Sequence, residues 1–209
     1  MSLELSNDHQ EREILQTELL KFSGTPHTCC VSIVDIVNST RTASTISEAK
    51  LGMFYSIFLN YVSDLVQSHR GIVVKNIGDS LLYYFEDSSS SGDAILSSFN
   101  CNLDVVKKRN DLNEHLEDEG LPSISYRVSS DYGKVFLASS SFSSTRDIFG
   151  PTVNMCAKIN HVGKPNTFFI GSDLYINAKN LKCFEFDEIT GNELNILKNQ
   201  YPVYNVKKV

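Results

Sequence analysis

The sequence has no tryptophan, and only five prolines and five cysteines are present among its 209 residues. The odd number of cysteines and the absence of a Cys-x-x-Cys pair argue against a disulfide scaffold and a zinc ribbon. The five histidines are scattered without the spacing of a metal site. Most of the cysteines lie in apolar runs, which predicts reduced, buried thiols: Cys29, Cys30, Cys101, Cys156 and Cys183.

A long apolar run and a surplus of basic residues are also missing. No stretch approaches the roughly 20 apolar residues of a membrane-spanning helix, and residues 1–10 are polar rather than signal-like. We therefore expect a cytoplasmic protein with no membrane partner. The formal net charge is −6, which argues against a nucleic-acid polymer as partner, because phosphate-backbone binding needs excess positive charge. A small nucleotide is compatible with this charge, since a few lysines and a metal can supply positive charge locally.

Of all residues, 41% are apolar and 21% are charged, which is the composition of an ordinary globular protein. The length suits one domain with an accessory segment. Residues 8–22 place Ile14, Leu15, Leu19 and Leu20 among polar residues, which predicts a short amphipathic helix. That helix packs on the domain, links it to a sensor or pairs with a second copy. We divide the chain into an N-terminal helix or linker, 1–24, and a main domain, 25–209.

Residues 30–85 are the most informative stretch. An apolar run ends in Asp35 and small polar residues, which predicts a strand followed by a turn. Further on, two apolar runs flank Gly78-Asp79, which predicts a hairpin. Between the strand and the hairpin, apolar residues at helical spacing predict a helix over 47–69: Leu51, Phe54, Tyr55, Phe58, Val62, Leu65 and Val66.

The order strand, helix, hairpin, helix, strand is typical of the ferredoxin-like folds. We predict an α+β fold with a ferredoxin-like βαββαβ core, a central, mostly antiparallel sheet flanked by helices, and a C-terminal extension. After the hairpin we predict a helix at 93–117, followed by a strand at 124–128, a turn at Asp131-Tyr132-Gly133 and a strand at 134–137. A flexible arm at 139–145 and a helix at 152–162 come next. The last element is a strand at 202–206, which we predict at the edge of the sheet because it begins with proline.

Asp35 and Asp79 would meet if their strands are neighbours in the sheet. Two carboxylates at one sheet edge repel each other unless positive charge lies between them. Mg²⁺ or Mn²⁺ suits such oxygen ligands, and nucleotide phosphates would complete the coordination shell. Each Asp taken alone is more often a solvated turn residue. Their combination with the later motifs favours a metal site.

The residues that carry these motifs resemble the class III nucleotidyl cyclases. Two motifs of this sequence, Asp35-Ile-Val-x-Ser-Thr and, further along, Lys75-x-x-Gly-Asp-Ser, are similar to the pair of motifs that binds metal in the family. Residues 147–158, Asp-Ile-Phe-Gly-Pro-Thr-Val-Asn-Met-Cys-Ala-Lys, are similar to the family's Asp-x-x-Gly-x-Thr-Val-Asn-x-Ala-x-Arg segment. The resemblance covers about residues 28–206.

This resemblance implies a site for two Mg²⁺ or Mn²⁺ ions, held by Asp35, Asp79 and the carbonyl of Ile36. Successive backbone N–H groups form a nest that binds anions. We expect the triphosphate to lie on the backbone amides from Ile36 onward: those of Val37, Asn38, Ser39 and Thr40.

Lys75 and Asp147 fall where adenylyl cyclases carry their adenine-reading residues. A Lys donates to adenine N1 and an Asp accepts from the 6-amino group, whereas guanine reverses this pattern, and unpaired polar groups would then disfavour it. Without the resemblance, Lys75 is equally an exposed strand lysine and Asp147 a turn or capping residue.

The resemblance also implies that Asn154 orients the ribose and that Lys158 stabilises the transition state. The family has Arg where Lys158 stands. A Lys keeps the charge but lacks the planar, two-pronged donor geometry, so we expect weaker phosphoryl stabilisation. Lys198 falls near the family's triphosphate-binding Lys, although the alignment there is loose and a plain surface lysine is the simpler interpretation.

Taken together, the resemblance implies an adenylyl cyclase that converts ATP to 3′,5′-cyclic AMP and pyrophosphate. In the family the carboxylates and the base-reading groups come from different subunits, which implies a head-to-tail homodimer. The alternative is a cyclase-homology module, catalytically weak or inactive, that binds nucleotide or dimerises as a regulator. Lys158 favours this alternative. A dinucleotide cyclase is disfavoured, because the sequence has no Gly-Gly-Asp/Glu-Glu-Phe turn.

Overall fold

The computed structural model describes residues 20–87, 93–140, 143–190 and 201–209. In chain order the elements are β1 (Leu20–Phe22), β2 (His27–Ile36), α2 (Ser39–Ala43), α3 (Glu48–Ser68), β3 (Ile72–Ile77), β4 (Ser80–Glu86), α4 (Asp93–Lys107), α5 (Arg109–Asp118), β5 (Tyr126–Ser140), β6 (Ser143–Phe149), α6 (Pro151–Val162), β7 (Phe168–Gly171), α7 (Ser172–Ala178), β8 (Phe184–Glu188) and β9 (Val203–Lys208).

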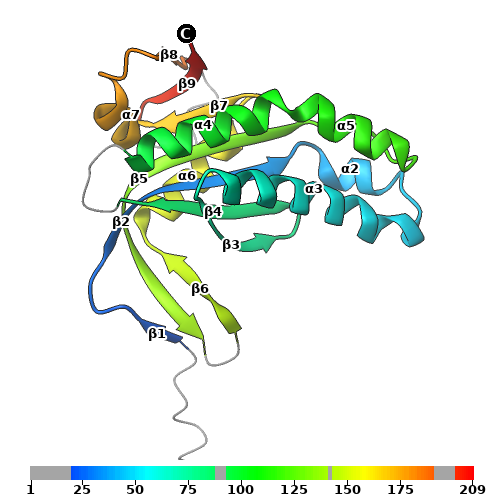
Figure 1. Cartoon of the computed structure of the whole chain (residues 1–209), viewed down its shortest axis with the longest axis horizontal. Coiled ribbons are helices and arrows are strands. Elements are labelled where there is room, and N and C mark those ends of the chain that lie inside the picture. Colours follow the sequence, from blue (N-terminus) through cyan, green and yellow to red (C-terminus); the bar gives the residue numbers. More distant parts are fainter. Residues whose placement is uncertain (1–19, 88–92, 141–142, 191–200) are drawn as a thin grey trace, which may run out of the picture.

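The central sheet has the strand order β3-β4-β2-β5-β7-β9-β8 (Figure 1). Strand β2 pairs antiparallel with both β4 and β5, and β3 pairs antiparallel with β4. Strands β5 and β7 pair in parallel, whereas β9 pairs antiparallel with β7 and β8. The predicted α+β class and the βαββαβ core, formed by β2, α3, β3, β4, α4, α5 and β5, are confirmed.

Helices cover both faces of this sheet. Helices α3, α4 and α5 lie in front of it in Figure 1, and α6 lies behind it. The apolar residues at helical spacing that predicted a helix over 47–69 lie mainly on the buried side of α3. Phe54, Phe58, Val62 and Val66 are fully buried there. On the other face Cys156 and Ile159 of α6 are fully buried. The predicted helix at 93–117 is two helices, because α4 ends at Lys107 and α5 begins at Arg109.

A buried polar network fixes α4 on the sheet. The Tyr83 hydroxyl donates to Asn102 Oδ1 (2.6 Å). Asn102 Nδ2 donates in turn to Ser32 Oγ (3.2 Å) and Ser98 Oγ (3.1 Å). All four residues are fully buried. Since these polar atoms are paired with one another, the network avoids the cost of burying unpaired groups and specifies one position of the helix.

The turn predicted at Asp131-Tyr132-Gly133 is wrong, because β5 runs without interruption from Tyr126 to Ser140. Asp131 and Gly133, whose residue types favour turns, instead make close contacts inside the protein. Asp131 accepts a hydrogen bond from the Tyr201 hydroxyl (2.8 Å). A side chain at Gly133 would collide with Thr152, whose Oγ1 lies 2.5 Å from the point that a Cβ would occupy.

Beyond the body of the sheet, β5 continues into an arm. It pairs there with β1 on one side and β6 on the other, and the arm projects from the molecule in Figure 1. The flexible arm predicted at 139–145 is built from strands at residues 139, 140 and 143–145, and its flexibility stays a prediction. Residues 141 and 142 lie outside the described residues. The helix predicted for 8–22 is wrong at Leu20–Phe22, which pair as a strand, and its earlier part lies outside the described residues.

The C-terminal strand is also placed differently from the prediction. Strand β9 lies between β7 and β8, so it is an interior strand, and β8 forms the edge of the sheet. Proline suggested an edge because it cannot donate to a ladder. Pro202 precedes β9, however, and therefore leaves the ladder intact.

The cysteines behave as small apolar residues, with one exception. All five are free; Cys29, Cys30, Cys101 and Cys156 are buried, whereas Cys183 is exposed. Burial raises the pKa of the Cys29, Cys101 and Cys156 thiols to about 12. Buried thiols with such pKa values are chemically inert at neutral pH.

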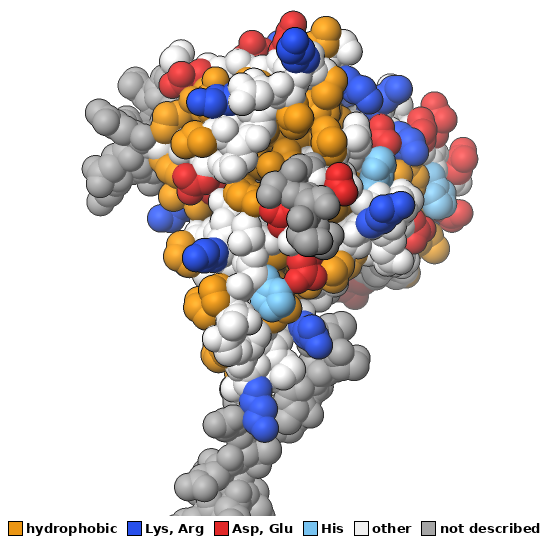
Figure 2. Space-filling view, turned by 60° about the vertical axis from the view of Figure 1, so that its left-hand side comes forward, with side chains coloured by type: hydrophobic (Ala, Val, Ile, Leu, Met, Phe, Trp, Pro, Cys, Tyr) orange, Lys and Arg blue, Asp and Glu red, His pale blue; other side chains and the backbone are white. Residues whose placement is uncertain are grey.

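In the part of the chain that the structure describes, no helix combines the length and the apolar character needed to span a membrane. On the face shown in Figure 2, acidic and basic side chains are interspersed. The absence of a nucleic-acid partner stays a prediction from the net charge.

Asp131 is a buried carboxylate with an unusual pKa. It is 1% exposed, and its Oδ1 has no hydrogen-bond partner among the described residues. Burial raises its pKa from 3.8 to about 7, while the hydrogen bond from Tyr201 acts in the opposite direction. The folded protein therefore holds this proton more tightly than the unfolded chain does. This contribution to stability is fully present below about pH 4 and is lost as the pH rises through about 7.

We expect Asp131→Asn to increase the free energy of unfolding at pH 8 by about 2 to 4 kcal/mol, because the amide carries no charge to bury. The difference from wild type should shrink toward pH 5. Denaturant titrations at pH 5, 6, 7 and 8 measure this, with Asp64→Asn on the exposed side of α3 as the control. A pH dependence of the Asp131→Asn variant equal to that of wild type would contradict the assignment.

Candidate active site

The sheet brings Asp35 and Asp79 to one corner of the molecule. Asp35 lies near the end of β2, where it pairs with Ser80, the first residue of β4. Asp79 precedes Ser80 in the β3–β4 turn, in which Gly78 adopts a positive φ of 63° that glycine accommodates without strain. The ends of two neighbouring antiparallel strands thus carry the two carboxylates. Their predicted proximity is seen in the structure, whereas their metal-binding role stays a prediction.

Both carboxylate oxygens of Asp35 are engaged within the chain. The Ser80 hydroxyl donates to Oδ1, and Arg127 Nη2 donates to Oδ2 at 2.9 Å. Arg127 Nη1 also donates to the carbonyl of His161 at 3.1 Å. The Asp35 and Arg127 side chains are 22% and 20% exposed. This ion pair is therefore half-buried, and Arg127 offsets the negative charge of the corner.

Arg127 and Ser80 were missed by sequence reasoning. Arg127 stands between Tyr126 and Val128 in a strand of alternating burial, so the pattern alone assigns it to an exposed face. Only the register, in which Asp35 pairs with both Arg127 and Ser80, reveals the contact. The one signal available was a cation within a predicted half-buried strand, which is weak.

The turn after Asp35 has the form expected of an anion cradle. The Val37 N–H donates to the carbonyl of Ser125 at 2.8 Å, so this amide, predicted to bind the triphosphate, is already paired within the chain. Asn38 adopts the left-handed conformation, with φ 57° and ψ 33°, and α2 begins at Ser39. Amides in the first turn of a helix have no acceptor within the helix, so those of Ser39 and Thr40 remain available to a ligand.

A cleft of about 420 Å³ borders this cradle. Val37, Asn38 and Arg41 line one side, and residues 122–125 and Pro165 line the other. Arg41 adds a positive charge to this cleft.

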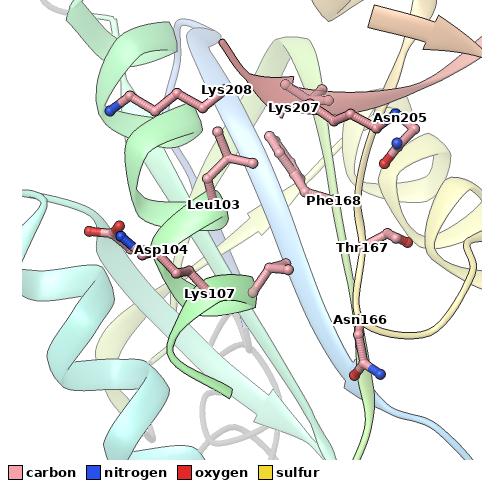
Figure 3. Close-up of a pocket in the computed structure, with 11 residues that line it drawn as sticks. Leu103, Asp104, Lys107, Asn166, Thr167, Phe168, Asn205, Lys207 and Lys208 are labelled. Carbon is pink, nitrogen blue, oxygen red and sulfur yellow. The ribbon is translucent and has the colours of Figure 1, made fainter. Parts of the chain in front are cut away.

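A second hollow, of about 440 Å³, lies elsewhere, between α4 and the strands β7 and β9 (Figure 3). Leu103 and Phe168 face each other across it, while the amino groups of Lys207 and Lys208 point away from its middle. Lys207 binds Asp187 at 2.6 Å. None of the predicted site residues lines this hollow, so we assign the active site to the Asp35 corner.

Lys75 and Asp147 form an ion pair. Lys75 lies on β3 and Asp147 on β6, and Lys75 Nζ donates to Asp147 Oδ2. The other carboxylate oxygen accepts the backbone N–H of Ile148 at 2.8 Å. The Lys75 side chain is 44% exposed and that of Asp147 is 25% exposed. The two residues predicted to read the base are thus adjacent and accessible.

Asn154 and Lys158 share one exposed side of α6. The opposite side of the helix packs on the sheet, where Asn160 Nδ2 donates to the carbonyls of Ile33 (3.0 Å) and Arg127 (3.3 Å). Asn154 and Lys158 are both exposed. The structure therefore presents both side chains to solvent. Lys198, the last predicted site residue, lies outside the described residues.

The donor set at the corner fits hard divalent cations. Within the described residues, no group of three or more His, Cys, Asp and Glu side chains is close enough to hold a metal by itself. Mg²⁺, however, is commonly bound by one or two carboxylates together with substrate phosphates. Two aspartates beside an anion cradle match that arrangement, since the phosphates supply the remaining ligands.

Comparison with known proteins identifies the family. Residues 23–206 match the family model described as the adenylate and guanylate cyclase catalytic domain. The chain belongs to this cyclase family. An adenylate cyclase of Streptomyces coelicolor (strain ATCC BAA-471 / A3(2) / M145) is 26% identical over 142 residues, 67% of this chain and 31% of that protein. The cyclase domain thus matches about a third of the length of that relative.

Solved structures agree on the fold. The adenylyl cyclase CyaB from P. aeruginosa has a TM-score of 0.75 at 15% identity, with 90% of this chain and 97% of that chain covered. The guanylyl cyclase Cya2 has a TM-score of 0.74 at 17% identity, with 89% and 94% covered. Both kinds of cyclase share the fold, so the fold alone does not distinguish an adenylyl from a guanylyl cyclase.

We expect Arg127→Met to lower the free energy of unfolding by about 1 to 3 kcal/mol, because it leaves the half-buried Asp35 carboxylate without its cation. Arg109→Met is the matched control, since Arg109 donates to its exposed sequence neighbour Asn110. Denaturant titration at pH 7 measures both variants. Equal losses in the two variants would show that the Arg127–Asp35 pair adds no stability.

Proposed function

We propose that this cyclase domain converts ATP to 3′,5′-cyclic AMP and pyrophosphate. The observation that carries the proposal is the Lys75–Asp147 ion pair, which presents one donor and one acceptor side by side on accessible side chains. In the reaction the ribose 3′-oxygen forms a bond to the α-phosphorus, and the bond from that phosphorus to the β-phosphate oxygen breaks. We also propose a cytoplasmic location, where ATP is present and thiols stay reduced.

The ion pair suits adenine better than guanine. Lys75 would donate to N1, and Asp147 would accept from the 6-amino group, so each would exchange part of its present contact for a contact with the base. Guanine would turn its N1–H toward the Lys75 amino group and its O6 toward the Asp147 carboxylate. Two mismatched polar pairs in a partly buried site are the kind of penalty that gives strong discrimination.

The corner would hold the triphosphate. Asp35, Asp79 and the carbonyl of Ile36 would hold two Mg²⁺ or Mn²⁺ ions. Such ions, when bound, lower the pKa of the attacking hydroxyl and neutralise phosphate charge. The amides of Asn38, Ser39 and Thr40 would orient the phosphates, whereas the Val37 amide is already paired with the Ser125 carbonyl. Arg127 would add a further cation beside them.

The remaining predicted groups, Asn154 and Lys158, lie on the exposed side of α6 rather than on the side that packs on the sheet. We therefore propose a head-to-tail homodimer, in which Asn154 and Lys158 of one copy orient the ribose and stabilise the phosphoryl charge at the other copy's carboxylates. Lys198 would bind the triphosphate.

The alternative function is that of a regulator that binds nucleotide with little turnover. Lys158 favours it, because a single ammonium group cannot make the two parallel hydrogen bonds of a guanidinium to a phosphoryl group.

The direct experiment incubates the purified protein with Mn²⁺ and either ATP or GTP and measures cyclic products by chromatography. We expect cyclic AMP from wild type and none from Asp79→Asn. Nucleotide binding without product in wild type would support the regulator instead.

We expect Lys75→Glu combined with Asp147→Cys to reduce kcat/KM for ATP by about 100-fold and to raise that for GTP, because the donor and acceptor pattern is then reversed. Steady-state kinetics with both nucleotides measure the ratio. Lys182→Glu, an exposed lysine outside the site, is the control for the change in charge. An unchanged ratio in the double variant would refute the base-reading role.

We expect Lys158→Arg to increase kcat by about three- to thirtyfold with little change in the ATP to GTP ratio, since the substitution acts on the phosphoryl group rather than the base. Lys164→Arg provides a control of the same chemistry, because Lys164 lies beyond the end of α6. A lower kcat in Lys158→Arg would mean that the site is built around the shorter ammonium group.

A further inference from the structure

Strand β1, at the N-terminal side of the domain, pairs with the arm that β5 and β6 form. Leu20, Lys21 and Phe22 pair with Ser140, Ser139 and Ala138 of β5. The Ser23 amide then donates to the Leu137 carbonyl (2.6 Å), and the Leu137 amide donates to Ser23 Oγ (3.1 Å). The arm is thus three strands wide, β1-β5-β6, and Figure 1 shows β1 running alongside β5.

The outer strands of this arm are linked on one face. Phe22 pairs with Ala138, and Ala138 pairs with Asp147 of β6, so these three residues form one row across the strands. Residues two apart in a strand point to the same side, and Phe149 therefore shares the face of Asp147. The rings of Phe22 and Phe149 meet edge to face, with their centroids 5.3 Å apart and an interplanar angle of 68°.

Phe149 also lies beneath Lys75. The Lys75 amino group is 6.0 Å from the centroid of the Phe149 ring, within range of a cation–π interaction. The same amino group binds Asp147. A lysine that is 44% exposed has many rotamers available to it, and the ring and the carboxylate together restrict them.

Phe22 is itself 55% exposed. An exposed aromatic ring contributes little to a core, but at this position its edge restrains the Phe149 ring. Side-chain contacts therefore connect Phe22 of β1 to Phe149, and Phe149 to the Lys75–Asp147 pair.

We propose that Phe22 and Phe149 are positioning residues that fix the Lys75 amino group where it reads the base, so that the nucleotide selectivity of the domain depends on the docking of β1. This inference rests on the proposed base-reading role of Lys75 and Asp147. It adds that the segment leading into the domain takes part in choosing the nucleotide.

The test compares Phe22→Ala with Lys21→Ala, a substitution in the same strand one residue away, on the alternate face. Equilibrium dialysis with Mn²⁺ gives the affinities for ATP and GTP, and steady-state kinetics give kcat and KM for each. We expect Phe22→Ala to lower the preference for ATP over GTP by about three- to tenfold, through KM rather than kcat. We expect Phe22→Tyr and Lys21→Ala to keep the wild-type ratio.

A Phe22→Ala ratio equal to that of wild type would overturn the proposal, as would equal losses in Phe22→Ala and Lys21→Ala. Thermal unfolding checks that the arm is intact. If Phe22→Ala does not fold, Phe149→Leu decides the matter, since it removes the ring but keeps an apolar side chain, and the proposal again requires a reduced ratio.

The two measurements separate this inference from the proposed function. Loss of ATP preference in the binding assay, without any cyclic product from wild type, would support the positioning role and refute the cyclase reaction. Formation of cyclic AMP by wild type, together with an unchanged preference for ATP over GTP in Phe22→Ala, would support the cyclase reaction and refute the positioning role. Equal binding of ATP and GTP by wild type would overturn the positioning role.

Discussion

The register of β2 between β4 and β5 is the constraint on which the site depends. In this register Asp35 pairs with Ser80 on one side and Arg127 on the other, and Asp79 directly precedes Ser80 in the adjoining turn. A shift of one residue would turn Asp35 to the opposite face of the sheet. The buried apolar residues of β2 and the polar network beneath α4 hold the register, so packing energy in the core is what keeps two carboxylates together at the edge.

The same sheet positions the other residues with proposed roles. Helix α6 is anchored through Asn160 to the carbonyls of Ile33 and Arg127, which leaves Asn154 and Lys158 facing solvent. Lys75 and Asp147 bind each other on β3 and β6. The proposed roles thus involve the Asp35 corner, the Lys75–Asp147 pair and the exposed side of α6, and in the proposed dimer these groups of two copies would meet.

Much of this architecture could be predicted from the sequence, because its signals are local. The Phe54, Phe58, Val62, Val66 stripe predicted α3, and the Gly78-Asp79 turn predicted the hairpin beside Asp35. The sequence misled where turn-favouring residues serve buried contacts, as at Asp131 and Gly133. It also misled at β1, where apolar residues suggested a helix but the segment pairs as a strand with a partner far away in the sequence. It was silent where strand register decides a contact, as for Arg127.

The central claim is that each site is assembled from two chains, and mixing two inactive variants tests it most directly. Asp35→Ala removes a carboxylate and Asn154→Ala removes the ribose contact, so each homodimer should be inactive. In an equimolar mixture, half of the dimers would carry one variant of each kind and one intact site, which predicts recovery of about a quarter of the wild-type cyclase activity. No recovery in a mixture shown by mass measurement to contain the mixed dimer would contradict the account.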